Sequence, residues 1–384
     1  MRNLGSQLIE GRNGDVLTLS MRRLETIVGY SPTYEFGDVV QEVTGADCIE
    51  VGDRQALELS RRVYKLVRLS TNSVRLGRAA APRPSLIRLK RDYQLFMPIF
   101  NHPYELYALA SVPEWRSRCR FAACWINEVW VHMLPAYLLE LLAQFDQIYL
   151  ATGNSVAEVG RIVGRPCNQL PMAADVLRFS SWPDPPARCI DVCNIGRRSE
   201  ITHAALVKLA AARKIGYYYD TITQQGVNAK QRIFHVKDHR EHRLLLAQIL
   251  QRSRYYIAHR SRINEPEYTG NNEEFSGRFF EGAAAGTILI GQAPRSEIFR
   301  TMFDWDDAVI PMPFDCPDIG QKLAELDADS QRLAAIPARN IGNAALRHDW
   351  LHRLQAVYTR FSLPPTPGMN DRDQRLLALA NSIR

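Results

Sequence analysis

The sequence predicts an α/β protein with two domains, each built on a doubly wound parallel sheet. From residue 93 onwards, apolar runs of strand length alternate with segments of helical periodicity, which is typical of a parallel sheet covered by helices. A proline-rich stretch at 180–187 interrupts this alternation, and a second series of the same kind follows it. The length of 384 residues also favours two domains.

The first domain is expected over residues 1–179. A strand at 15–20 opens it, and a helix leads to a second strand at 47–51. A helix is then predicted at 54–70, where apolar residues recur at helical spacing. The prolines of 79–85 indicate a loop. The remaining expected strands are 93–100, 120–126, 147–151 and 168–172, and the remaining helices are 104–110, 134–145 and 155–163.

The second domain is expected over residues 188–345, after the linker. Its expected strands are 188–196, 216–220, 255–258, 287–290 and 308–313, and its expected helices are 202–214, 239–253, 278–285 and 319–326. Residues 346–384 are predicted to form C-terminal helices, at 348–361 and 371–383, that pack back on the first domain.

Composition indicates a globular protein, with 46% hydrophobic and 23% charged residues. No apolar run is long enough to span a bilayer, and the N-terminus lacks the apolar core of a signal peptide. Seven cysteines, few and odd in number and without zinc-site spacing, favour reduced thiols, so we expect a cytoplasmic location. We expect these four to be buried: Cys119, Cys124, Cys189 and Cys193.

The net charge of +7 suits phosphorylated ligands, anionic lipid or nucleic acid, and charge by itself does not choose between them. Basic residues concentrate between Lys65 and Arg91. They form either a solvated surface or a surface that meets an anionic acceptor or the inner face of a membrane, so a peripheral membrane location stays open.

The stretch 273–291 carries the strongest functional signal. Ser276 and Gly277 are suited to begin a helix, because a small hydroxyl side chain caps free amides and glycine fits the first turn. The helix is rich in small residues, and Gly286 can end it in the left-handed conformation. The apolar run that follows predicts a strand buried on both faces.

This helix start is also a candidate anion site. Its free N–H groups and the positive end of its dipole lie beside Arg278, and both favour negative charge. Two carboxylates, Glu273 and Glu281, bracket the seven residues between them. An ordinary helix with solvated glutamates is the alternative, which the flanking strand and glycines disfavour.

The stretch resembles the Glu-x7-Glu signature of retaining GT-B glycosyltransferases. The resemblance implies that Glu273 lies near the donor sugar, that Glu281 binds the nucleotide ribose and that the amides between them hold the diphosphate. It also implies the GT-B plan of two Rossmann-like domains facing a cleft, and it covers about residues 93–345. The family's Pro-Phe-Gly is replaced here by Glu-Phe-Ser, with Gly277 displaced by one position.

A Gly-Arg-Arg turn follows the first strand of the second domain. Glycine permits a close backbone approach, and guanidinium groups bind phosphate oxygens in a bidentate manner. In the family this turn contributes an arginine to the donor diphosphate, so the resemblance assigns Gly196 and Arg197 to donor binding. The lysine that usually follows is Thr202 here, so a second cation must come from elsewhere. The candidates are His203, Lys230 and Arg278.

The first domain is expected to supply a group that orients the acceptor hydroxyl or takes up its proton. Glu128 is the first choice because it comes two residues after a buried strand, and His132 is the second. Packing at a helix start is the alternative for His132.

The resulting hypothesis is a retaining glycosyltransferase that moves a sugar from a nucleotide-diphosphate sugar to a hydroxyl acceptor in polysaccharide or glycoconjugate biosynthesis. The acceptor is a glycan, a lipid or a small molecule. Arginines would offset the charge of the leaving diphosphate, so no metal and no other cofactor is expected. Nucleic acid is not an expected partner, because the chain lacks its binding motifs. The alternatives are a GT-B-fold epimerase or phosphorylase, and a non-enzymatic protein that binds an anionic polymer.

Overall fold

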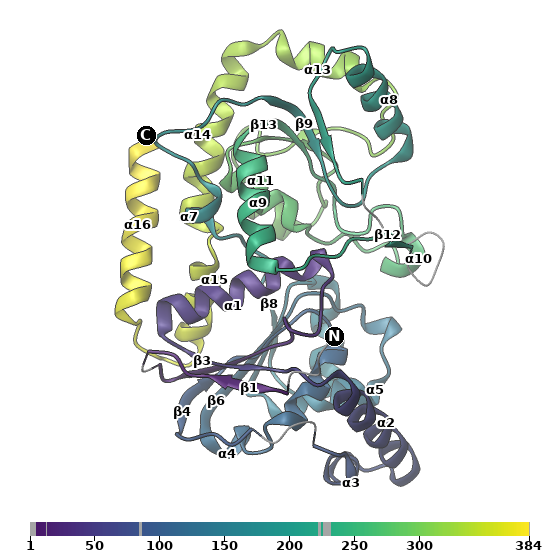
Figure 1. The fold of residues 1–384 in the computed structure, drawn as a ribbon, viewed down its shortest axis with the longest axis vertical. Coiled ribbons are helices and arrows are strands. Elements are labelled where there is room, and N and C mark those ends of the chain that lie inside the picture. The colour runs from purple at the N-terminus through teal and green to yellow at the C-terminus, as the bar shows by residue number, and fades with distance from the viewer. Residues whose placement is uncertain (1–4, 13, 84–86, 222–223, 226–231, 384) are drawn as a thin grey trace. The chain divides into compact units, whose positions relative to one another are not determined.

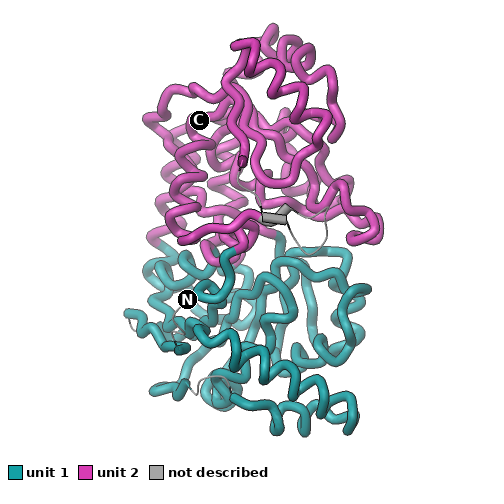
Figure 2. The backbone as a smooth tube through the Cα atoms, turned by 45° about the vertical axis from the view of Figure 1, so that its right-hand side comes forward, with its two compact units in different colours: residues 1–26, 36–171, 354–370 teal, residues 27–35, 172–353, 371–384 magenta. Residues whose placement is uncertain are grey.

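The computed structural model describes residues 5–12, 14–83, 87–221, 224–225 and 232–383. The chain forms two compact units, shown in two colours in Figure 2. Unit 1 comprises residues 1–26, 36–171 and 354–370, and unit 2 comprises residues 27–35, 172–353 and 371–384. The chain passes between the units at five points. Three of them lie within helices, which are α1 (Ser31–Thr44), α15 (Trp350–Arg360) and α16 (Pro367–Ile383).

Unit 1 contains an eight-stranded sheet in which neighbouring strands are parallel, except that β1 runs antiparallel to β3. The strand order is β1-β3-β2-β4-β6-β7-β8, and β5 pairs with β6. The strands are β1 (Gln7–Ile9), β2 (Val16–Ser20), β3 (Asp47–Glu50), β4 (Tyr93–Phe96), β5 (Ile99–Phe100), β6 (Cys119–Ile126), β7 (Gln147–Leu150) and β8 (Cys167–Gln169).

One long helix, α2, and several shorter helices pack around this sheet (Figure 1). The α-helices are α2 (Arg54–Thr71), α3 (Val74–Ala80), α4 (Trp115–Arg118), α5 (Ala136–Leu139) and α6 (Val156–Val163), and the 3-10 helices are η2 (Pro103–Ser111), η3 (Val131–Met133), η4 (Glu140–Gln144) and η5 (Gly153–Ser155). The core between sheet and helices is closed by large side chains such as Phe96, Trp115 and Phe145, all at most 1% exposed.

Unit 2 contains a second sheet whose five strands all run parallel, in the order β10-β9-β13-β14-β15. These strands are β9 (Ile190–Asn194), β10 (Tyr217–Tyr219), β13 (Ser253–Ile257), β14 (Ile288–Gly291) and β15 (Ile310–Pro311). A separate antiparallel pair consists of β11 (Gln224–Gln225) and β12 (Arg232–Ile233), and the 3-10 helix η1 (Val28–Tyr30) also lies in this unit.

The helices of unit 2 cover its sheet (Figure 1). They are α7 (Val176–Phe179), α8 (Glu200–Ala211), α9 (His239–Gln251), α10 (Pro266–Thr269), α11 (Gly277–Ala284), α12 (Glu297–Met302), α13 (Ile319–Asp327) and α14 (Ser330–Arg347), with the first turn of α15 and most of α16. Helix α11 packs against α7, α9, α14 and β14. Residues 279–284 of this helix are all buried.

The α/β fold class is confirmed, because each unit holds a mostly parallel sheet covered by helices. The expected strand 93–100 is divided into β4 and β5. Pro98 lies between them, and proline has no N–H to donate to a strand ladder. The expected helix 134–145 is also divided, into α5 and η4. Helix α14 was not predicted, because Pro337 lies inside it and a proline argues against a continuous helix.

The compact units divide between residues 171 and 172, ahead of the proline-rich stretch at which the sequence suggested a boundary. The domain limits at 179 and 188 therefore stay predictions. Three of the four thiols expected to be buried are so, but Cys189 is exposed. It precedes the first residue of β9, outside the buried part of the strand.

Candidate donor site

The predicted donor residues lie at one edge of the unit 2 sheet. Strand β9 ends at Asn194 and leads into the turn at 196–198, while β13 ends at Ile257 and leads into 259–262. Because all strands of this sheet are parallel, their carboxyl ends meet at the same edge. Ligands of doubly wound sheets bind at this edge.

Helix α11 begins and ends as the sequence predicts. The Ser276 side chain accepts a hydrogen bond from the Arg278 N–H at 3.5 Å and caps the helix. At the other end, Gly286 adopts a φ of +65°, the left-handed conformation that glycine tolerates best. Strand β14 follows and is buried along its whole length. The loop, helix and parallel strand predicted from this stretch are therefore confirmed.

The Gly-Arg turn and the helix start, which are 81 residues apart in sequence, meet in unit 2. The Arg278 guanidinium donates a hydrogen bond from Nη1 to the carbonyl oxygen of Arg197, at 3.1 Å. Gly196 adopts a φ of +72°, which residues with a side chain rarely adopt, and a Cβ there would lie 2.8 Å from Arg278 Nη2. Glycine therefore suits this turn, because a side chain would strain the backbone and displace the guanidinium. The turn is fixed further by the Gly196 N–H, which donates to the Asp220 carboxylate.

Arginines outnumber carboxylates around this turn. Glu265 pairs with Arg197 at 2.7 Å and with Arg262 at 2.6 Å. In contrast, Arg278 and Arg198 donate to carbonyl groups, and neither has a carboxylate partner among the described residues. The Nε and Nη1 atoms of Arg198 are buried with no hydrogen-bond partner in that part of the chain. The edge therefore has an excess of positive charge, which suits an anionic ligand.

Glu273 is held on a neighbouring loop as a carboxylate. It accepts hydrogen bonds from the Arg295 backbone N–H at 2.8 Å and from the Arg295 guanidinium at 2.9 and 3.1 Å. Burial by itself would raise the pKa of Glu273, but the hydrogen bonds from Arg295 and the nearby charge of Arg260 lower it overall. Glu273 therefore stays ionised and is poorly suited to donate a proton. Its expected position beside the donor sugar stays a prediction.

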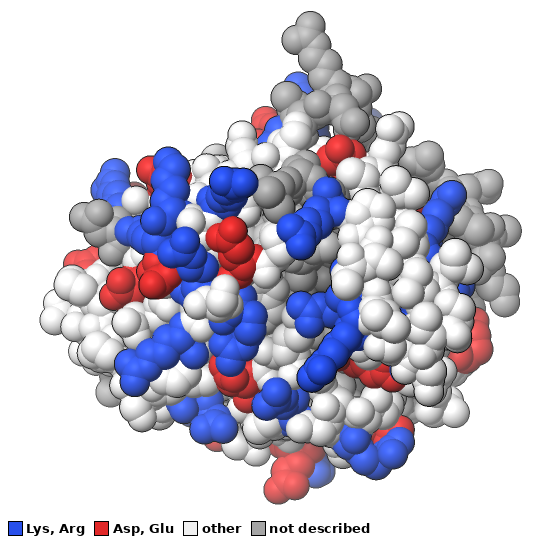
Figure 3. Space-filling model, turned by 90° about the horizontal axis from the view of Figure 1, so that it is seen from below, with Lys and Arg blue, Asp and Glu red and all other residues white. Residues whose placement is uncertain are grey.

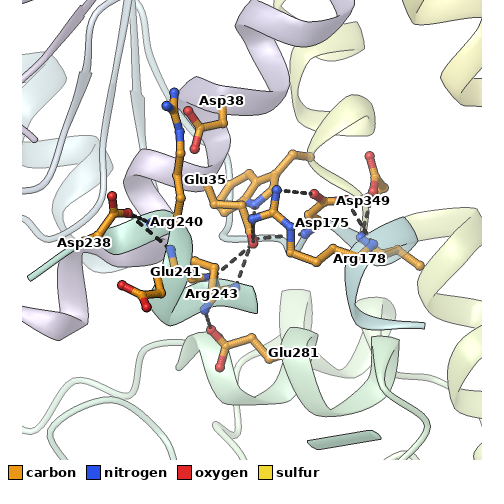
Figure 4. A network of polar contacts seen from close by, with 12 residues as sticks. Glu35, Asp38, Asp175, Arg178, Asp238, Arg240, Glu241, Arg243, Glu281 and Asp349 are labelled. Carbon is orange, nitrogen blue, oxygen red and sulfur yellow. Dashed lines mark hydrogen bonds and ion pairs between the residues drawn. The ribbon is translucent and has the colours of Figure 1, made fainter. Parts of the chain in front are cut away.

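Glu281 is fixed by a buried ion pair that the sequence did not predict (Figure 4). Arg243 of α9 donates from Nη1 to Glu281 Oε1, and from Nε and Nη2 to the two carboxylate oxygens of Glu35, each at 2.9 Å. Arg243 is 2% exposed and Glu281 is 5% exposed. Among the described residues, no other group forms a hydrogen bond with the Glu281 carboxylate, so Oε2 stays available to a ligand hydroxyl.

Gly277 completes the packing around this carboxylate. A Cβ at this position would lie 3.6 Å from Glu281 Oε1 and 3.2 Å from the methyl group of Met172. A side chain at Gly277 would therefore displace the Met172 methyl group slightly, and it would lie at ordinary van der Waals distance from Glu281 Oε1.

His259 is a site residue that the sequence reasoning missed. Its Nδ1 accepts a hydrogen bond from the Gln292 N–H at 3.0 Å, so Nε2 carries the proton of the neutral ring. Burial lowers the pKa of His259 to about 3, and the positive charges of Arg278 and Arg260 contribute. The ring is therefore an uncharged donor beside the arginines. Its position directly after a strand was the available signal.

The candidate acceptor residues belong to unit 1. Glu128 is half-buried after β6, and its Oε1 accepts a hydrogen bond from Trp130 Nε1 at 2.7 Å. His132 is exposed in η3, so the alternative that it packs at a helix start is not favoured. Glu105 of η2 is another buried carboxyl group of this unit: it is 8% exposed and accepts hydrogen bonds from the Asn101 backbone and side chain at 2.8 and 3.1 Å. Burial raises the pKa of Glu105 to about 8.

Of the two remaining candidates for a second cation, the structure describes one. His203 forms a hydrogen bond with the Tyr217 hydroxyl at 2.9 Å, at the β10 side of the sheet. Lys230 lies outside the described residues. Within the described ranges, no three His, Cys, Asp or Glu side chains cluster as a metal site would require, and no helix is long and apolar enough to cross a membrane.

We predict that Arg243→Met will lower the free energy of unfolding by about 3–5 kcal/mol, because it leaves two buried carboxylates without their cation. Chemical denaturation monitored by circular dichroism measures this loss. The matched control is Arg161→Met, which breaks an exposed pair with Glu158 and should cost less than about 1 kcal/mol. Equal losses for both variants would contradict a stabilising role for the buried ion pair.

Comparisons with known proteins place these observations in a family. Two solved structures share a distant likeness with the chain. "Crystal Structure of TarM" is 10% identical, with a TM-score of 0.42, over 70% of this chain and 54% of that one. A UGT transferase from Siraitia grosvenorii, in complex with UDP, is 8% identical, with a TM-score of 0.40, over 90% of this chain and all of that one. This chain thus spans about half the length of the TarM chain.

No curated protein matches the sequence. A family model described as glycosyl transferase-like matches residues 156–359, which is more than half of the 384 residues. This range contains the Gly-Arg turn, the Arg243 ion pair and helix α11. The chain therefore belongs to the glycosyl transferase-like family.

Proposed function

We propose that this protein transfers a sugar from a nucleoside diphosphate sugar to a hydroxyl acceptor, with retention of configuration and without a metal ion. One observation carries the proposal. The Arg278 guanidinium lies against Gly196 at the start of α11, with no carboxylate partner among the described residues. A cation and free helix amides at the carboxyl edge of a parallel sheet form a suitable binding site for a diphosphate.

In this proposal the diphosphate is both the donor's anchor and the leaving group. The bond between the anomeric carbon and the terminal phosphate oxygen breaks, so negative charge builds up on that phosphate. Arg278, Arg198 and the N–H groups at the helix start would stabilise this charge from fixed positions. Arg197 is held more firmly, because it already pairs with Glu265. The neutral His259 ring would add a hydrogen bond without adding charge.

The two glutamates have different roles in the proposal. Glu281 would accept hydrogen bonds from the ribose hydroxyls through Oε2, because Oε1 is occupied by Arg243. Glu273 would face the sugar as an ionised acceptor of hydroxyl hydrogen bonds. Retention rests on the resemblance to the Glu-x7-Glu group. The ion pairs around Glu273 support a binding role rather than a covalent one, because Arg295 already contacts both carboxylate oxygens.

The new glycosidic bond forms when the acceptor hydroxyl attacks the anomeric carbon and loses its proton. Glu128 is the proposed group that orients this hydroxyl or accepts the proton. His132 is the second choice and, being exposed, is sterically accessible. The proposed acceptor is a hydroxyl group of a glycan, a lipid or a small molecule.

Contact with an anionic membrane stays a further proposal, and so does a cytoplasmic location. Figure 3 views the molecule from the side on which α2 and α3 lie in Figure 1, and groups of Lys and Arg side chains lie on this face among acidic and uncharged ones. Helices α2 and α3 also expose leucine side chains by more than half, namely Leu59, Leu66, Leu69 and Leu76. Basic and apolar side chains together favour a membrane surface.

We expect Arg278→Met and Glu128→Gln to change donor affinity and kcat in different ways. Loss of Arg278 should weaken binding of the donor about 10- to 100-fold and also lower kcat, because a charge-assisted contact to the diphosphate is lost. Loss of Glu128 should leave donor affinity unchanged and lower kcat. Calorimetric titration with nucleoside diphosphate sugars and steady-state kinetics measure the two effects.

The matched control for Arg278 is Arg300→Met, which removes the same charge from the exposed surface of α12. This control variant should change neither the affinity for the donor nor kcat. If both test variants weaken donor binding equally, Glu128 contacts the donor and not an acceptor. That result would favour an epimerase or a nucleotide-binding protein over a transferase.

We predict that Glu281→Gln will weaken binding of nucleoside diphosphates, because the single amide oxygen cannot both accept from Arg243 and replace the Oε2 atom that is available to the ribose hydroxyls. It will also lower stability, since Arg243 keeps only one of its two carboxylates. This stability loss should be smaller than that of Arg243→Met. Calorimetry and denaturation measure the two effects, with Glu241→Gln on the exposed surface of α9 as the control. Unchanged nucleotide affinity would exclude the ribose contact.

Metal independence is tested directly with a chelator. Turnover is expected to persist in excess EDTA, because fixed arginines perform the electrostatic role that a divalent cation performs in other transferases. The measurement compares initial rates before and after chelation and after addition of magnesium or manganese. Activity that disappears with EDTA and returns with either metal would overturn the assignment of Arg278 and Arg198 to the diphosphate.

A further inference from the structure

Unit 1 contains a cavity of about 340 Å³ between α2, α3, η2, α4 and η4. Its volume falls within the range of about 300–1,000 Å³ that is typical of small-molecule sites. Buried aromatic side chains form much of its lining, among them Tyr64, Tyr107 and Trp115, which are at most 5% exposed. Leu106, Leu109 and Leu141 add aliphatic surface. One part of the cavity is therefore apolar and enclosed.

The same cavity is basic where its lining is exposed. Arg75, Arg78 and Arg83 line it, all three are exposed, and no aspartate or glutamate is among the lining residues. None of the three forms an ion pair or hydrogen bond with another described residue. By contrast, the arginines of the neighbouring helix α2 form ion pairs, for example Arg68 with Glu140 at 2.7 Å. Three unpaired cations at one cavity attract a negatively charged group.

We propose that this cavity binds a single-chain anionic amphiphile. The anionic head, a phosphate or a carboxylate, contacts Arg75, Arg78 and Arg83, and the alkyl chain packs against Tyr64, Tyr107 and Trp115. Burial of alkyl groups in the apolar part of the cavity favours binding, and charge-assisted hydrogen bonds fix the head. The site lies wholly in unit 1, so the inference does not depend on the donor site or on the proposed reaction.

Nearby surface features fit a membrane as the source of such a ligand. Leu66, Leu69 and Leu76 are exposed by 54–70% on the two helices that also line the cavity. An amphiphile could leave a membrane with little exposure of its chain to water if these helices met the lipid. A free fatty acid offers the same chemistry in solution, and the head-group comparison below separates the two sources.

The test uses the full-length protein and three soluble probes with the same chain: octyl phosphate, octanoate and 1-octanol. Isothermal titration calorimetry should show binding of an anionic probe that is at least about tenfold tighter than that of octanol. Preference for octyl phosphate assigns a lipid phosphate, preference for octanoate assigns a fatty acid, and either supports the proposal. Equal affinity for octanol, or binding of none of the three, overturns it.

Two variants locate the site. Replacing Arg75, Arg78 and Arg83 together by glutamine should weaken anionic-probe binding at least about tenfold and leave octanol binding unchanged. The matched control replaces Arg54, Arg62 and Arg161, whose side chains are 62%, 74% and 71% exposed. Ala110→Leu, which fills the cavity, should abolish binding of all three probes while thermal unfolding reports that the protein is folded. If the two triple variants weaken binding of the anionic probes equally, the arginines of this cavity do not form the site.

Discussion

The ion pair between Arg243 and two buried carboxylates, Glu35 and Glu281, is the polar contact on which the geometry of the candidate donor site depends. A guanidinium that is 2% exposed must be neutralised and fully hydrogen-bonded, or it costs several kcal/mol. Burial by itself would lower the pKa of Arg243, but Glu35 and Glu281 raise it, so the residue stays charged. Glu35 in turn accepts hydrogen bonds from Trp350 Nε1 at 3.0 Å and the Asp175 N–H at 3.1 Å.

This requirement positions the candidate donor site. Glu281 lies one turn from the start of α11, so the ion pair that fixes its carboxylate also fixes where the helix begins. The helix start then brings Arg278 against the glycine of the 196–198 turn. A second buried group, in which Arg372 pairs with Asp175 at 2.6 Å and with Asp349 at 2.8 Å, holds the neighbouring segments. A binding site made of loops is thus supported by buried charges.

Much of the architecture was predictable, because it depends on short-range patterns. A purely apolar run identified β14, and the serine and glycine at the ends of α11 gave its limits within one or two residues. The exceptions are informative. Helix α14 continues through Pro337, and in the folded unit this helix packs against α11, α13 and β14, so tertiary contacts outweigh the local cost of proline. Sequence pattern does not report that compensation.

The sequence by itself determined the α/β class, the helix start at Ser276 and the presence of a basic turn after β9, because each depends on residues that are adjacent in the chain. Tertiary structure decided which charges are free. Arg197 and Arg278 are the same residue type, so the sequence does not distinguish them. In the structure Glu265 pairs with Arg197, and no described carboxylate pairs with Arg278. The partner of Glu281 is 38 residues away and that of Glu35 is 208 residues away. Groups so far apart in the sequence come together only on folding. They must then form pairs, because an unpaired buried charge would destabilise the folded unit.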